Sequence, residues 1–174
     1  MNVTVFEQQQ KRQKGVFTLF NRRSRESESE GTSIHKKLMV FSDGGARGNP
    51  GPAAIAFMIL MENGQVLIKD SHYIGSRTNN QAEYEALIAA LESAAAVDAE
   101  EVTCHLDSEL VAKQLTGGYK VKDPELRKLW WKVQELKKGF KKISFVNVPR
   151  TNNQIQKADE LVNETLDEEF KRPL

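Results

Sequence analysis

Four acidic residues stand where a folded chain usually places apolar residues or begins a loop. Asp43 and Asp107 each occupy the last position of a predicted strand. Helical spacing puts Glu83 and Asp159 on the apolar faces of two predicted helices, where an isolated charge is costly. Acids in such positions indicate a site that uses negative charge.

The chemistry that fits these acids is the binding of divalent cations. Acids at strand ends in α/β sheets gather at one edge of the sheet, and inward-facing helix acids can meet them there. Carboxylates that converge stay ionised only when cations compensate their charge. Oxygen ligands favour Mg²⁺ or Mn²⁺. The three histidines and the single cysteine do not have the spacing of a zinc site.

Each acid also has a purely structural explanation. Asp43 could be a turn residue before Gly-Gly, and Asp107 could be the N-cap of the following helix. Glu83 could complete a hydrogen bond at its helix start, and Asp159 could pair with a nearby lysine or arginine. These alternatives remain open for each residue taken alone.

The elements that would position the acids follow from hydrophobic periodicity and from turn residues. Short apolar runs predict five strands, and 3.6-residue periodicity predicts four helices. The strands are 38–41, 53–61, 66–74, 102–106 and 143–148, and the helices are 81–96, 108–115, 123–138 and 154–170. The order βββαβααβα predicts an α/β fold with a five-stranded mixed sheet flanked by helices.

Composition indicates a soluble globular protein. The 174 residues are 39% hydrophobic and 28% charged, and no apolar run approaches the ~18 residues of a membrane helix. We therefore expect no membrane association. The lack of a signal pattern and the single cysteine, Cys104, favour the cytoplasm. Residues 1–36 are expected to form a flexible charged tail, and 37–174 the folded domain.

The motifs around the acids resemble those of the type 1 ribonuclease H family, in its short form without the basic protrusion. The segments that carry the resemblance are DGGARGNPG from Asp43, TNNQAE ending at Glu83, Asp107-Ser108 and Ala158-Asp159. They occur in this order over about residues 37–170, each on the expected element. The resemblance therefore implies a ribonuclease H-like fold.

The resemblance also implies an activity and a cofactor. Asp43, Glu83, Asp107 and Asp159 would be the catalytic ligands of two divalent ions, Mg²⁺ or alternatively Mn²⁺. The enzyme would cut the RNA strand of RNA–DNA hybrids with little sequence preference, leaving 5′-phosphate and 3′-hydroxyl ends. We expect a monomer, because one hybrid fits one active edge.

A second set of residues resembles the family's substrate contacts. Glycines at 44 and 45 would let the RNA backbone approach closely, and several amides would read the 2′-hydroxyls that distinguish RNA from DNA. The expected substrate-binding residues are Gly44, Gly45, Asn49, Thr78, Asn79, Asn80, Gln81 and Ser108.

The sequence departs from the family pattern before the last acid. The family often has a histidine in this loop, and residues 146–150 contain none. Asn147 or Arg150 is a candidate to replace it. The interval from Arg150 to Asp159 is also about two residues longer than is usual.

One apolar segment interrupts the N-terminal tail. Residues 13–20 resemble a peptide that binds a DNA sliding clamp, with Gln13, Val16, Leu19 and Phe20 in the motif positions. The alternatives are an unanchored tail, a tail that packs on the domain, and an organelle-targeting segment, which the tail's glutamates disfavour.

Three other functions compete with the hybrid nuclease. A binding module would keep the fold without cutting, but clustered acids would then only repel phosphates. An integrase or DNA-directed nuclease could share the fold, although the Asn-Pro-Gly and Asn-Asn-Gln-Ala-Glu segments favour hybrid specificity. A domain detached from a reverse transcriptase is the remaining alternative.

Overall fold

The computed structural model describes residues 37–171. Its elements are β1 (Lys37–Ala46), β2 (Gly51–Met61), β3 (Val66–Arg77), α2 (Asn79–Ala96), β4 (Glu101–Leu106), α3 (Glu109–Leu115), α4 (Pro124–Lys137), β5 (Lys142–Asn147) and α5 (Asn153–Lys171). The predicted element order is confirmed. The expected tail and its clamp-binding segment, residues 1–36, lie outside the described residues.

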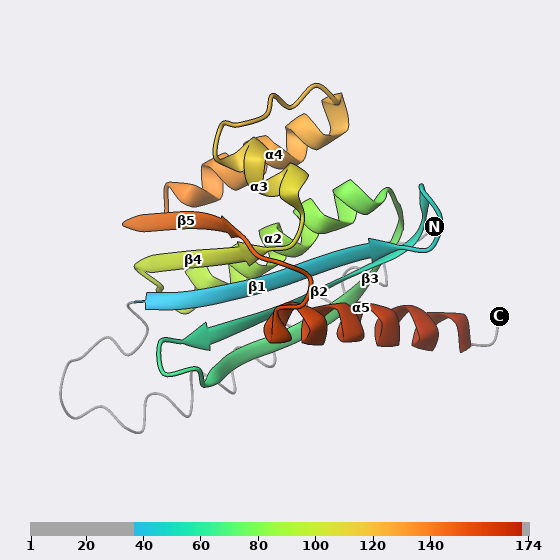
Figure 1. Cartoon of the computed structure of the whole chain (residues 1–174), viewed down its shortest axis with the longest axis horizontal. Helices are drawn as coiled ribbons and strands as arrows, with labels where there is room; N and C mark the ends of the chain where they lie inside the picture. The colour runs from blue at the N-terminus through green and yellow to red at the C-terminus, as the bar shows by residue number, and fades with distance from the viewer. Residues whose placement is uncertain (1–36, 172–174) are drawn as a thin grey trace. The chain divides into compact units, whose positions relative to one another are not determined.

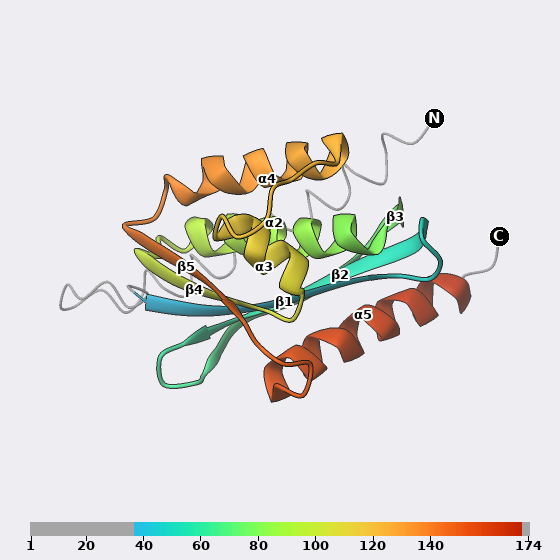
Figure 2. The same ribbon diagram turned by 45° about the horizontal axis from the view of Figure 1, so that its top comes forward.

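The five strands form one mixed sheet in the order β3-β2-β1-β4-β5. Strand β2 pairs antiparallel with both β1 and β3, whereas β1–β4 and β4–β5 are parallel pairs. Helices α2, α3 and α4 lie on one face of the sheet, and α5 lies on the other (Figures 1 and 2). The fold is therefore the predicted α/β arrangement, with α4 packed on α2 (Figure 2).

Strand β1 is longer than its apolar run predicted. The prediction placed Asp43 at the last strand position, but pairing with β2 continues through Gly44, Gly45 and Ala46. The prediction was wrong because these small residues interrupt the apolar pattern while their backbone still pairs with Ala53–Ile55. Asp43 thus lies inside the sheet, where only 9% of its surface is exposed.

The two helices that carry acids begin at different kinds of cap. Thr78 caps α2: its hydroxyl accepts the Gln81 N–H, and the Gln81 side chain accepts the Thr78 N–H. Asn152 plays the equivalent part for α5, since its side chain accepts the N–H groups of Gln154 and Ile155. Both starts are fixed by local hydrogen bonds.

The apolar stripe of α5 differs from the expected one. Its buried residues are Ile155, Ala158, Val162 and Leu166. Asp159 follows Ala158 and is rotated out of the stripe, so its predicted burial was wrong and it is exposed. Three-residue spacing from one apolar residue was insufficient, because the stripe runs through Ala158 instead.

Two apolar layers hold the helices on the sheet. The larger lies under α2, α3 and α4 and includes Tyr84, Leu87, Leu91 and the fully buried Cys104. The layer under α5 is smaller, with Val162 and Leu166 packed on Ala54 and Ala56 of β2. None of the described helices is both long and apolar enough to cross a membrane.

Candidate active site

The parallel pairing of β1 with β4 aligns two of the predicted acids. The last pair in the register is Phe41 with His105, whose rings stack 4.4 Å apart between centroids. Asp43 and Asp107 each come two residues later, so they continue the same register on the same face of the sheet. The pairing of β1 with β4 therefore places these two carboxylates beside each other.

Two glycines let helices approach this part of β1 from opposite faces. A Cβ atom on Gly44 would lie 2.2 Å from the backbone carbonyl of Ala82 in α2. A Cβ atom on Gly45 would lie 3.1 Å from the Val162 side chain of α5. The glycines were predicted to admit RNA, and the structure shows that they also admit the helices that carry Glu83 and Asp159.

Glu83 is held beside the sheet with one of its oxygens unused. The Asn79 side-chain amide donates to its Oε1 atom at 3.1 Å, whereas the buried Oε2 atom has no hydrogen-bond partner. The pKa of Glu83 is raised to about 7, mainly by burial and also by the charges of Asp107 and Asp43, while the Ser108 side chain and Arg150 act in the opposite direction. A buried acceptor without a partner favours binding of a cation.

Asp43 lies at the centre of the acids. Burial raises the pKa of its carboxyl to about 7, and the charges of Asp107 and Asp159 act in the same direction. Its neighbouring backbone N–H at Gly44 and the more distant Arg150 counteract part of that rise. The structure thus brings the other three predicted acids within electrostatic reach of Asp43.

The outer two acids have identifiable partners. Arg150 Nε lies 3.3 Å from Asp107 Oδ2, although the arginine side chain is 83% exposed. Asn163, one turn along α5, donates its amide to the backbone oxygen of Asp159 and also contacts the Asp159 carboxylate. Ser108, and not Asp107, caps α3 by accepting the Val111 N–H. The structural alternative for Asp107 is therefore excluded.

The predicted substrate-binding residues divide into two groups. Thr78, Gln81 and Ser108 cap helices as described above. Asn49 and Asn79 join the β1–β2 loop to α2: Asn49 Oδ1 accepts the Asn79 N–H, and Asn79 Oδ1 accepts the Ala46 N–H. Asn80 lies in the first turn of α2 and is partly exposed.

Asn147 and Arg150, the two candidates to replace the family's loop histidine, make different contacts. Asn147 ends β5, and its side-chain amide donates to the Leu106 carbonyl at 3.0 Å. This bond ties β5 to the end of β4. Arg150 instead extends to Asp107, so only the arginine presents its charge to the acids.

The donor set fits a hard divalent ion. It consists of carboxylate oxygens, two of them on buried groups with raised pKa values, and it includes the unpartnered Glu83 Oε2. Within residues 37–171, no three acidic, histidine or cysteine side chains are yet close enough to enclose an ion. Binding would therefore require some carboxylates to turn away from their present partners, such as Arg150 and Asn163.

Sequence reasoning missed three contributors to this site. Asn163 orients Asp159, and its position four residues after an acid on one helix was the available signal. The packing role of Gly44 had no signal in the sequence alone. Arg47 was quoted only as part of a motif, yet it contacts α5, as described below.

The fold resembles that of proteins with known structures. Residues 41–165 match the family described as reverse transcriptase-like. The crystal structure of ribonuclease H1 from Halobacterium salinarum has a TM-score of 0.73 and 44% identity, over 76% of this chain and 98% of that one. The LC11 ribonuclease H1, crystallised in complex with an RNA/DNA hybrid, gives a TM-score of 0.73 and 44% identity over 77% and 99% of the two chains.

Curated relatives extend beyond the region that matches. Ribonuclease HI of Halobacterium salinarum is 44% identical over 132 residues, which are 76% of this chain and 65% of that protein. A bifunctional protein of Mycobacterium tuberculosis is 41% identical, and the match spans 36% of its length. The chain thus covers less than two thirds of these relatives. Its motifs, fold and similarity over most of its own length nevertheless agree, and the chain belongs to the type 1 ribonuclease H family.

Proposed function

We propose that this protein is an endoribonuclease that hydrolyses the RNA strand of RNA–DNA hybrids. Cleavage would depend on two divalent ions, with Mg²⁺ as the expected metal, and would leave 5′-phosphate and 3′-hydroxyl ends. The observation that carries the proposal is that Glu83, Asp107 and Asp159 all lie within electrostatic reach of the buried Asp43. The LC11 relative with its bound hybrid supports the substrate class.

The four carboxylates would hold the ions, with Asp43 between the others. Bound divalent ions supply an activated water and stabilise charge on the leaving oxygen. The remaining residues orient these ligands: Asn79 holds Glu83 through its amide, and Asn163 holds Asp159. Asn49 and Asn79 lie together beside the site, where their amides suit contacts to ribose hydroxyls.

The proposal is tested by incubating the purified chain with four labelled substrates: hybrid, single-stranded RNA, duplex RNA and duplex DNA. Each reaction contains Mg²⁺, Mn²⁺ or EDTA. We expect metal-dependent cutting of the RNA in the hybrid alone, and products that an RNA ligase joins without prior end treatment, because ligation requires both a 5′-phosphate and a 3′-hydroxyl. Binding of the hybrid without cutting under both metals would favour the binding module, and cutting of duplex DNA would favour another nuclease of this fold.

Replacing Arg150 with alanine is expected to slow hybrid cleavage about tenfold, because the arginine that ion binding would free from Asp107 could no longer contact a substrate phosphate. Thermal stability should stay unchanged, since an ion pair with so exposed a partner contributes little to folding. Single-turnover rates would check this, with Lys at position 150 retaining part of the rate. A rate within twofold of wild type for Arg150→Ala would remove this residue from the proposed machinery.

The interaction of residues 13–20 with a sliding clamp, the monomeric state and the cytoplasmic location stay predictions. They rest on the sequence patterns given above.

A further inference from the structure

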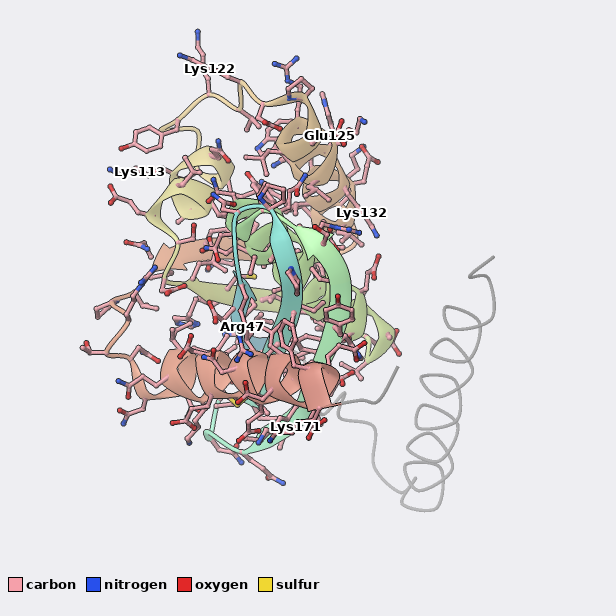
Figure 3. The ribbon with its side chains drawn as sticks, turned by 90° about the vertical axis from the view of Figure 1, so that its right-hand side faces the viewer. Arg47, Lys113, Lys122, Glu125, Lys132 and Lys171 are labelled. Atoms are coloured by element: carbon pink, nitrogen blue, oxygen red, sulfur yellow. The ribbon has the colours of Figure 1, made fainter. Side chains whose placement is uncertain are left out.

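Two residues of the loop between β1 and β2 contact different helices: Arg47 contacts α5, and Asn49 contacts α2. On one side, the Arg47 guanidinium lies 2.5 Å from Asp167 Oδ1 in α5, and its Cζ atom lies 5.4 Å from the centre of the Phe170 ring. On the other side, Asn49 accepts the N–H of Asn79 at the start of α2. Arg47 lies over α5 in Figure 3.

Contacts within the loop restrict its conformation, so a displacement of Arg47 would also displace Asn49. The Arg47 N–H donates to the Pro52 carbonyl at 2.8 Å, and a Cβ atom on Gly51 would lie 2.1 Å from the Arg47 carbonyl oxygen. Gly48, between them in the turn, has a φ of +98°, which other residues rarely adopt. These constraints leave the loop few ways to change shape without moving as a unit.

The contacts continue from the loop to a catalytic carboxylate. Asn49 holds the Asn79 backbone, the Ala46 N–H holds the Asn79 side chain, and the amide of that side chain donates to Glu83 Oε1. A route of direct contacts therefore connects the last turns of α5 with Glu83. It passes through two amides, Asn49 and Asn79, that the proposed function assigns to the substrate.

The contact between Arg47 and α5 contributes little to the stability of the fold. The side chains of Arg47 and Asp167 are 39% and 54% exposed, and Phe170 is 59% exposed. Ion pairs this exposed contribute little to folding. The guanidinium nevertheless lowers the pKa of Asp167 and lies over the ring of Phe170. One arginine thus makes two specific contacts with α5.

We propose that Arg47 is a positioning residue. Its contacts with Asp167 and Phe170 of α5 hold the β1–β2 loop in place, and this keeps Asn49 and Asn79 in the positions from which they would bind the RNA strand. This inference rests on the proposed function for its substrate, but the fastening itself is independent of it. An arginine that instead contacted a substrate phosphate directly would not need Asp167.

Four variants separate these possibilities: Arg47→Ala, Asp167→Asn, Arg47→Asp, and the exchanged pair Arg47→Asp with Asp167→Arg. Glu135→Gln is the control, because it breaks an exposed ion pair with Lys138 at the end of α4. We expect Arg47→Ala and Asp167→Asn each to raise KM for the hybrid about fivefold while kcat changes less than twofold. The exchanged pair should recover most of this loss, and Glu135→Gln should behave as wild type.

A second measurement does not depend on activity. Hydrogen exchange of the backbone amides of residues 47 and 79 should become faster in Arg47→Ala, Asp167→Asn and Arg47→Asp, and slow again in the exchanged pair. An unchanged KM and unchanged exchange in Asp167→Asn would overturn the proposal, as would an exchanged pair no better than Arg47→Asp alone. If the wild-type chain cut no hybrid, the proposed function would fail, and hydrogen exchange would still decide whether the loop is fastened in this way.

Discussion

Asp43→Asn is expected to abolish hybrid cleavage and at the same time to stabilise the metal-free protein. Cleavage should fall by at least about 100-fold, since the central ion ligand loses its charge. Stability should rise because burial and the neighbouring acids raise the pKa of Asp43 to about 7 in the folded chain, against an ordinary value of 3.8. At pH 8 the folded state must carry this unfavourable charge, and asparagine removes it.

The gain in stability from Asp43→Asn is expected to increase with pH. A carboxyl whose pKa is raised by folding stays protonated in the folded state while it ionises in the unfolded state, so stability falls as pH rises from about 4 to about 7. The gain from Asp43→Asn should therefore be small near pH 4 and reach about 4 kcal/mol at pH 8 in EDTA. Glu83, with its pKa also raised to about 7, adds to the fall in the wild type.

Urea unfolding in EDTA across this pH range measures the effect, with Asp98→Asn as the control. Asp98 is an exposed acid with a positive φ, a conformation that asparagine also tolerates. Adding Mg²⁺ at pH 8 should stabilise the wild type and leave Asp43→Asn unaffected. Equal loss of stability at all pH values in the variant would contradict the account of a buried, cation-requiring carboxylate.

Gly44→Ala is expected to have the second large effect, on both folding and cleavage. The added Cβ atom would lie 2.2 Å from the Ala82 carbonyl carbon and oxygen and 2.6 Å from the Glu83 nitrogen. All three are backbone atoms, so the start of α2 would have to move. We expect a loss of about 3 kcal/mol in stability. A displacement of Glu83 by even ~1 Å would lower the rate by about 100-fold.

Gly118→Ala is the matched control for this substitution. Its Cβ atom would meet the Lys113 carbonyl oxygen at 3.5 Å, an ordinary contact distance. Its melting temperature and cleavage rate should be close to those of the wild type. A Gly44→Ala protein that melted and cut like Gly118→Ala would show that the approach of α2 to β1 is not needed for the site.

Much of this fold could be predicted because its elements carry their signals locally. Strand β4 has apolar residues at alternate positions, and Asp123-Pro124 marks the start of α4 by an N-cap and a proline. The stripe of α2 through Leu87 and Leu91 was predicted correctly as well. The four acids could be singled out because each lies next to such a signal.

The details that the sequence left open depend on contacts between distant segments. The extension of β1 past Asp43 needs its partner in β2, and the space required beside Gly44 comes from Ala82 in α2. The exposure of Asp159 follows from how α5 rotates to seat Val162 against Gly45. None of these partners is a near neighbour in the sequence, so local periodicity could not supply them.

The central claim is that the four acids act as one ion-holding set, and it is tested most directly by single-turnover cleavage of an RNA–DNA hybrid in saturating Mg²⁺. The proteins compared are the wild type, the four single variants Asp43→Asn, Glu83→Gln, Asp107→Asn and Asp159→Asn, and the double variant with Asn at 43 and 159. We expect every single variant to lose at least about tenfold in rate, and the double variant to be no slower than the slower of its two parents, because residues that act as a unit are not additive. Losses that multiply in the double variant, or a single variant that cuts at the wild-type rate, would contradict the claim.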